Sequence, residues 1–245
     1  MPNEILTTVY TQHTVYLQRL GATLGRDVIP YLQEIDKQVQ AIFSKYEGRS
    51  VTVKNRATIQ EQISKVSKEQ LQLYVSELKK DIRVIGANEG EFSATTLNDV
   101  VENDDFNSKA PSAAQINAVA ISTPIKIGDN AFTSYNSIMS NYWQKWTAEI
   151  DGIVMAGFSS GQTINEVAEN VYSQLRLTTT DTSSNTLTRA KRSARQLAIT
   201  GTNHYANQAR VAFVDVNDDL LEGYRFLAVL DSRTSQQCRA LDQRV

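Results

Sequence analysis

Three arginines in the C-terminal half have a spacing that suits contact with nucleic acid. Arg189, Arg192 and Arg195 follow one another three residues apart, and no acidic residue occurs between positions 182 and 214. On a helix this spacing places the three guanidinium groups along one face. Such a face can bind DNA phosphates, with an affinity that falls as the salt concentration rises. The alternative is a solvated helix face, or one that pairs with acids elsewhere in the chain.

Cys238, His204 and Asp231 are the residue types of a nucleophilic enzyme site. A thiolate can attack, an imidazole with a pKa of about 6.5 can accept the proton, and a carboxylate can orient the imidazole. No local signature of a cysteine-dependent hydrolase surrounds Cys238, so a structural role is the alternative. The chain has one Cys and two His, too few for a thiolate or histidine-rich metal site. We expect neither a metal nor another cofactor.

A turn follows an alternating segment near the C-terminus, residues 224–230, which predicts a short β-strand. In this turn Asp231 can accept hydrogen bonds from backbone N–H groups two residues on. The five donors of Arg233 can tie two chain segments together. We therefore expect Arg233 to be buried and paired, and to hold the end of the strand against the helix that begins near Leu187.

The elements that must position these residues are mainly helical. The chain has 245 residues, 41% of them apolar, a net charge of -2 and four prolines. This length allows one or two domains with a real core, and the scarcity of proline favours long helices. A net charge near zero excludes a polybasic protein that wraps DNA. The N-terminus shows no signal peptide and no apolar run is long enough to cross a membrane, so we expect a soluble protein.

Apolar stripes at helical spacing predict long helices over residues 1–86. The first stripe ends near Leu24, and Asp27 has the type and place of an N-cap for the second. Ser67 and Gln70 have capping-box spacing, which predicts that a further helix begins at Ser67. Gly86 is expected to end that helix.

Residues 87–127 differ from the helical region before them. Acidic residues dominate positions 87–112, which predicts an acidic connector. Pro124 within the apolar, β-branched residues 118–127 favours an edge strand or an extended crossing. Residues 128–245 then form a third region, with a helix at 132–153, a capping box at Thr163, a helix at 187–214 and the strand at 224–230. The predicted fold class is mainly α, or α+β, with a small β element near the C-terminus.

Motifs in the last third resemble the phage Mu F-like minor head proteins, also called head-morphogenesis proteins. Residues 161–168 (GQTINEVA) are similar to the family's G-x-S/T-x-x-E-I/V-A helix start. Residues 195–200 and 203–210 resemble its long helix with N-x-A-R, and residues 223–234 (GYRFLAVLDSRT) resemble its G-x-x-W-x-A-x-x-D-x-R-T strand and turn. Residues 238–242 (CRALD) resemble the C/H-x-x-L-D-G ending. The order and spacing of all these motifs agree with the family.

The resemblance marks Asp231, Arg233, Thr234, Cys238, Leu241 and Asp242 as a structural signature. Where the family often has T-C-P-x-C, residues 234–238 (TSQQC) keep only the second Cys, so a role for a Cys pair is absent. The motif normally runs on past Asp242, so the module is expected to be truncated at its C-terminus.

The resemblance implies a non-enzymatic structural protein of a tailed-phage virion. Such a protein lies in the capsid interior, in several copies around the portal vertex, and serves head assembly, DNA packaging or DNA delivery. Its expected partners are the portal protein, other internal head or ejection proteins and packaged double-stranded DNA, with no membrane. Residues 1–86 would contact the portal. The alternatives are a DNA-binding protein that uses Arg189, Arg192 and Arg195, and an enzyme that uses His204, Cys238 and Asp231.

Overall fold

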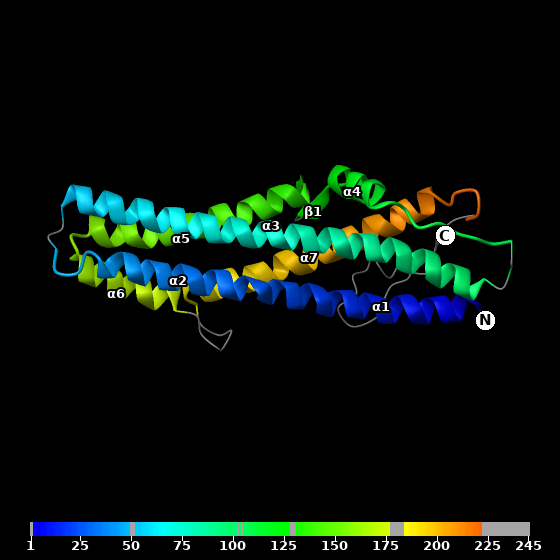
Figure 1. Cartoon of the computed structure of the whole chain (residues 1–245), viewed down its shortest axis with the longest axis horizontal. Helices are drawn as coiled ribbons and strands as arrows, with labels where there is room; N and C mark the ends of the chain where they lie inside the picture. Colours follow the sequence, from blue (N-terminus) through cyan, green and yellow to red (C-terminus); the bar gives the residue numbers. More distant parts are fainter. Residues whose placement is uncertain are drawn as a thin grey trace. The chain divides into compact units, whose positions relative to one another are not determined.

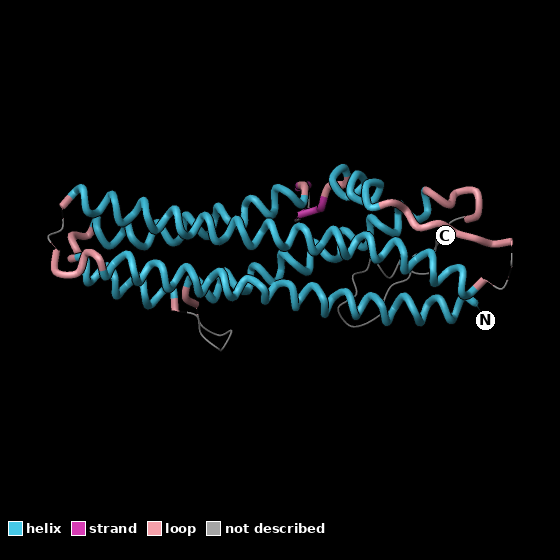
Figure 2. Tube along the Cα trace, viewed as in Figure 1, coloured by secondary structure: helices cyan, strands magenta, loops and turns pink. Residues whose placement is uncertain are grey.

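The computed structural model describes residues 2–49, 52–101, 103, 105–127, 131–176 and 184–221. In these residues the fold is mainly helical, as predicted (Figure 1, Figure 2). The elements are α1 (Pro2–Leu24), the 3-10 turn η1 (Gly25–Val28), α2 (Ile29–Ser44), α3 (Val53–Val100), α4 (Ala113–Ser122), β1 (Ile125–Ile127), β2 (Ala131–Thr133), α5 (Tyr135–Ser159), α6 (Ile164–Leu175) and α7 (Thr186–Asp215). Strands β1 and β2 pair in a two-stranded sheet. The strand expected at 224–230 lies outside the described residues.

The chain forms two compact units, and three helices continue through both. Unit 1 comprises Met1–Leu20, Ile82–Ile125 and Gly201–Val245, and unit 2 comprises Gly21–Asp81 and Lys126–Thr200. The division between residues 125 and 126 falls close to the expected boundary at 127. The expected long-helix region 1–86, by contrast, is shared between the two units.

Unit 2 is built on the apolar faces of α2, α5 and α6. Helix α6 packs against both α2 and α5 (Figure 1). Phe43 of α2 meets Tyr172 of α6 edge-on, with ring centroids 5.8 Å apart. Gly157 of α5 allows α6 to come close, since a Cβ there would lie 2.8 Å from Val167. Burying these apolar faces supplies the main stabilisation of the unit.

Tyrosine hydroxyls on α3 and α5 attach these two helices to α7 within unit 2. The hydroxyls of Tyr142, Tyr74 and Tyr135 donate to the backbone carbonyls of residues 190, 194 and 197, at 3.2, 3.4 and 2.9 Å. All three tyrosines are buried, and burial raises the pKa of Tyr74 and of Tyr142 above the ordinary value. Each hydroxyl thus satisfies its own donor in the core while the ring fills apolar space.

Unit 1 places α4 on a face of α3 that carries two glycines. A Cβ at Gly86 would lie 3.2 Å from the Ile116 side chain, and one at Gly90 would lie 3.1 Å from Ile116 and from Pro111. Ile116 packs in turn on Ala209 and on another small residue of α7. Small residues on α3 and α7 therefore allow the close approach of α4.

The extended segment before α4 is held by two asparagine side chains. Asn98 accepts from the backbone N–H of Ser108 at 2.8 Å and donates to its carbonyl at 3.0 Å. Asn217 does the same for Lys109, at 2.7 and 2.9 Å, and also donates to a carbonyl of α7. Each carboxamide therefore satisfies both backbone groups of one residue, as a neighbouring strand would.

Several predicted helix boundaries are wrong. Helix α3 runs without a break from Val53 to Val100, so Ser67 does not start a helix, Gly86 does not end one, and positions 87–100 are not a connector. The side chain of Ser67 is buried instead on the packed face of α3. Gly86 serves the close approach of α4, and a lone glycine costs a helix only about 1 kcal/mol.

Two further boundary predictions are corrected. The chain passes from α1 to α2 through η1 in helical conformation, so Asp27 caps nothing, and the N-cap position of α2 is Val28 without a side-chain hydrogen bond. The extended crossing expected over 118–127 is confined to 125–127, because Ser112 and Gln115 form a capping box that starts α4. Pro124 lies just past the end of that helix, where proline is tolerated.

The predicted boundaries that match the structure are the start of α6 and the extent of α7. Thr163 caps α6, and its backbone N–H binds the Glu166 carboxylate at 2.8 Å. These bonds lower the pKa of Glu166. Helix α7 spans Thr186–Asp215, close to the predicted 187–214. Helix α5 begins later than predicted, at Tyr135, and passes Gly157 to end before Gly161, whose φ is +79°.

Candidate functional site

A buried ionic cluster links α1, α3 and α7 in unit 1. Its centre is Glu89, whose side chain is 0% exposed. His13 Nε2 lies 2.6 Å from Glu89 Oε2, and Arg210 Nε donates to Glu89 Oε1 at 2.7 Å. Arg210 Nη2 lies 2.6 Å from the same oxygen. Both oxygens of the carboxylate are therefore occupied, one by α1 and one by α7.

Aromatic rings enclose this ionic cluster. The His13 imidazole stacks on the Phe92 ring, with centroids 3.7 Å apart and planes 11° apart. Tyr10 meets Phe92 edge-on at 5.6 Å, and the Arg210 guanidinium lies over the Tyr10 ring at 5.5 Å. Burial raises the pKa of the Tyr10 hydroxyl. The Glu89 side chain is fully buried, and the low dielectric around it strengthens its attraction to Arg210, whose side chain is partly exposed.

The geometry of the cluster suits a role in holding the three helices together better than it suits acid–base catalysis. A general base must reach a proton of its substrate, and both Glu89 oxygens are already bound within the chain. Glu89 was predicted only as part of the acidic connector. Its position in the sequence could have predicted its burial. Glu89 lies four residues after Ile85 and therefore shares the buried helix face of Ile82 and Ile85.

His204, the proposed base of the enzyme alternative, is bound to a helix end. The residue is 9% exposed, and its Nε2 lies 2.8 Å from the carbonyl oxygen of Ala120 near the end of α4. That carbonyl belongs to the last turn of α4, where no intrahelical N–H is left to bind it. Cys238 and Asp231 lie outside the described residues, so their convergence with His204 stays a prediction.

The three arginines of the proposed DNA-binding face differ in their surroundings. Arg189 Nη2 donates to Glu149 of α5 at 2.6 Å, and its guanidinium lies over the ring of Trp146 at 5.5 Å. Arg192 and Arg195 are exposed. The backbone of Arg195 also makes a close contact, because a Cβ at Gly25 would lie 2.3 Å from its Cα. The Arg189 guanidinium is thus engaged within unit 2, and Arg192 and Arg195 are exposed residues of the same helix.

The signature of the C-terminal segment lies outside the described residues. This holds for Asp231, Arg233, Thr234, Cys238, Leu241 and Asp242. The expected burial of Arg233 therefore stays a prediction.

Unit 2 carries an acidic pocket of about 230 Å³ between η1, α2 and α3. Asp27, Glu77 and Asp81 lie on its wall together with the rings of Tyr31 and Tyr74. Burial raises the pKa of Asp81 above the ordinary 3.8, and the neighbouring Asp27 and Glu77 raise it further. Within the described residues, no group of three or more His, Cys, Asp or Glu side chains has the arrangement to hold a metal ion.

The comparisons with known proteins add no family or structural neighbour: no family model, no curated protein and no solved structure matches this chain. No helix in the described part of the chain has both the length and the apolar run that a membrane crossing requires.

Proposed function

We propose that the chain is a structural minor head protein of a tailed bacteriophage, bound at the portal vertex inside the capsid and used in head assembly, DNA packaging or DNA delivery. The observation that carries this proposal is the ordered series of motifs from residue 161 to residue 242. The first motif falls at the start of a helix, since Thr163 caps α6. The N-x-A-R segment falls within the uninterrupted helix α7.

The polar residues of the resembling segment that the structure describes favour a structural role. Arg210, the arginine of N-x-A-R, binds the buried Glu89. His204 binds the carbonyl at the end of α4. Both side chains are engaged in holding helices together, which is the work expected of a non-enzymatic module.

Exposed apolar side chains on α1 offer a surface for adhesion to a partner. Ile5 is 52% exposed and Tyr16 is 56% exposed, and both lie on the described part of α1 in unit 1. Exposed large apolar side chains are enriched at protein–protein contacts. We propose that they contact portal subunits by the mode in which a helix face docks on its partner.

The test is co-purification with the portal protein of the same phage. The wild-type chain should co-purify with the portal and be found in purified virions, with cross-links from α1 to the portal. Tyr16→Asp should abolish co-purification, because it places a charge in an apolar contact. Gln18→Asp, at an exposed position of α1 on a different face from Ile5 and Tyr16, should retain it. Virions that lack the chain, or portal binding that Tyr16→Asp leaves unchanged, would contradict the proposal.

The absence of catalysis is part of the proposal and has its own test. Cys238→Ser removes the one thiol of the chain, and only a thiolate is a strong nucleophile. Infectivity should stay within a few fold of wild type. Abolished infectivity with normal folding of the variant would favour the enzyme alternative.

DNA binding is the second candidate function, favoured by the exposure of Arg192 and Arg195. Each phosphate contact contributes a slope of about -0.9 to the dependence of log affinity on log salt for duplex DNA. Arg195→Gln should therefore reduce the magnitude of that slope by about one contact. Arg189→Gln should change it less, because Arg189 is paired with Glu149. Binding with no salt dependence would exclude this second function.

A further inference from the structure

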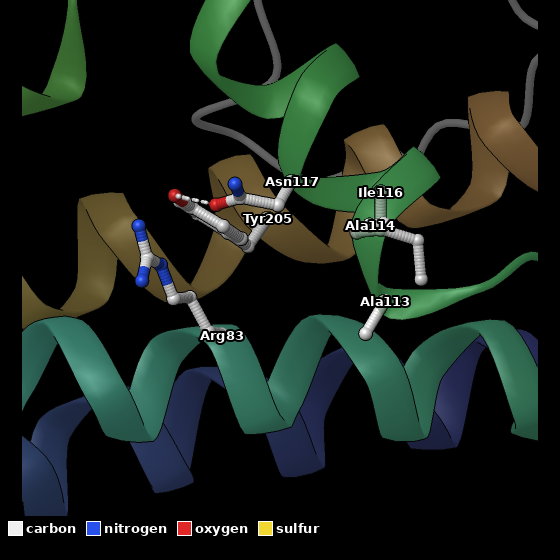
Figure 3. A pocket seen from close by; sticks show the side chains of 6 residues that line it. All are labelled: Arg83, Ala113, Ala114, Ile116, Asn117 and Tyr205. Carbon is white, nitrogen blue, oxygen red and sulfur yellow. Dashed lines mark hydrogen bonds between the residues drawn. The ribbon is translucent and has the colours of Figure 1, made fainter.

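An open pocket of about 270 Å³ lies between α3, α4 and α7 of unit 1 (Figure 3). It is separate from the ionic cluster around Glu89 and from the surface proposed to contact the portal. The polar groups that line it come from Arg83, Asn117 and Tyr205, and its apolar lining comes from Ala113, Ala114 and Ile116. Figure 3 shows the polar atoms gathered toward one end, with Ala113 and Ile116 toward the other.

The polar end presents hydrogen-bond donors. The Tyr205 hydroxyl donates to Asn117 Oδ1 at 3.4 Å, which turns the amide nitrogen of Asn117 away from the hydroxyl (Figure 3). That nitrogen carries two N–H donors, and the guanidinium of Arg83 carries five. Because Tyr205 is 3% exposed, the amide that it orients rests on a fixed wall of the unit.

Among the residues that the structure describes, Arg83 is the only charged one that lines the pocket. It makes no ion pair with any part of the chain that the structure describes, and its side chain is exposed. Its neighbours three and four residues away on α3 are Lys79, Lys80, Gly86 and Ala87, so its own helix offers it no carboxylate. The pocket therefore has a positive end without a counter-charge among the described residues.

The opposite end suits a small aliphatic group. Ile116 is buried beneath it, and Ala113 and Ala114 form a shallow wall in the first turn of α4. The close packing of Ile116 on Gly86 fixes the depth of this end. A bare phosphate would gain nothing from such a wall, whereas a carboxylate on a short aliphatic body would use both ends.

We propose that this pocket binds an aliphatic carboxylate with a body of about three to five carbons. The guanidinium of Arg83 pairs with the carboxylate in the two-bond geometry that a planar fork allows. The Asn117 amide donates to one carboxylate oxygen, and the aliphatic body lies on Ile116 and the two alanines. Small free acids and the C-terminal residue of a peptide share this chemistry.

The experiment measures binding to the full chain by ligand-observed NMR. The probes are isovalerate, its neutral amide, inorganic phosphate, and an acetylated tripeptide ending in valine with a free or an amidated C-terminus. Isovalerate should bind saturably, and its amide and phosphate should bind at least about tenfold more weakly, the difference expected for a lost charge-assisted pair. Binding of the free-ended peptide but not the amidated one would identify a chain terminus as the source. Failure of both peptides would identify a free acid.

Two variants locate the binding in the pocket. Arg83→Gln removes the cation and should weaken isovalerate binding by at least about tenfold. Ala114→Leu fills the apolar end and should also abolish binding. Lys79→Gln removes a charge one turn away on α3 and is the matched control. Because Arg83 and Ala114 are exposed, the variants should fold, and circular dichroism checks this. The proposal is overturned if wild type does not bind isovalerate, if phosphate binds as tightly, or if the folded Arg83→Gln variant binds normally.

Discussion

Replacing Glu89 by leucine should be the most informative perturbation of this fold. The Glu89 side chain is 0% exposed and serves Arg210 and His13 together. Glu89→Leu leaves the Arg210 guanidinium without its counter-charge in a site enclosed by aromatic rings. Breaking one side of a buried ion pair typically costs about 3–5 kcal/mol. Water reaches part of the Arg210 side chain, which is 29% exposed, so we expect about 3 kcal/mol, at the low end of that range.

The ion pair itself should contribute little, and a double variant separates the two effects. Replacing a whole buried pair by apolar residues of similar size is often neutral or stabilising. Arg210→Met added to Glu89→Leu should therefore restore most of the lost stability, to within about 1 kcal/mol of wild type. The coupling free energy between the two positions should be about 2 kcal/mol or more, since the side chains are in direct contact.

Urea unfolding followed by far-UV circular dichroism at neutral pH measures these changes. Glu91→Leu is the matched control, because Glu91 lies two residues away on α3 and is exposed. Surface substitutions of this kind change stability by about 0.5 kcal/mol or less. The reasoning is refuted if Glu89→Leu is no more destabilising than Glu91→Leu. It is also refuted if the double variant loses the sum of the two single losses.

Four further substitutions test other features of the fold by the same unfolding assay. Asn217→Asp should cost about 2 kcal/mol, because a buried carboxylate would face the two carbonyl oxygens to which the Asn217 amide donates; a loss below 0.5 kcal/mol would contradict this. Gly25→Ala should destabilise strongly, since the new Cβ would lie 2.3 Å from the Arg195 backbone. Gly152→Ala, which meets nothing within 4 Å, should stabilise by about 0.5–1 kcal/mol, and equal effects of the two would be inconsistent with the packing. Burial raises the pKa of Asp151 above 3.8, because the folded state disfavours the charged carboxylate. The free energy of unfolding should therefore fall as pH rises from the unfolded-state pKa through the raised pKa of the folded state. Asp151→Asn should be more stable than wild type at neutral pH and equal to it near pH 3.

The helix boundaries were predictable where the signal lies within the helix itself or in the few residues next to it. The Thr163 capping box lies within one element, as does the helix predicted over 187–214, and the structure places both close to where they were expected. The boundaries inside α3 were not predictable in this way. Ser67 has capping-box spacing, and only its burial within a helix of 48 residues shows that it caps nothing. Gly86 has the same local appearance as a helix stop, and its role depends on α4, which follows in the sequence.

The ionic cluster could not be predicted because its members are far apart in the sequence. Arg210 binds a carboxylate 121 residues away, and His13 binds the same carboxylate from 76 residues away on the other side. A local charge count assigns Glu89 to an acidic stretch, since it sums residues that face the core with residues that face solvent. To tell core-facing from solvent-facing residues, one must follow the helical periodicity of α3 past residue 86. The prediction ended the helix at Gly86, so this periodicity was not applied to Glu89.

This placement of polar groups bears on how a partner can be bound. In a helical protein, a polar side chain on a packed face must find its hydrogen bonds inside, or its burial is destabilising. Arg210 through its Nε, His204 and Asn217 meet that requirement within unit 1. Their substitution should therefore act on stability before it acts on any partner. Tyr16 is exposed on α1 and its ring lies 5.6 Å from that of His13, but it satisfies no buried polar group. A loss of the proposed portal binding with little change in stability is therefore expected at Tyr16 and not at the buried polar positions.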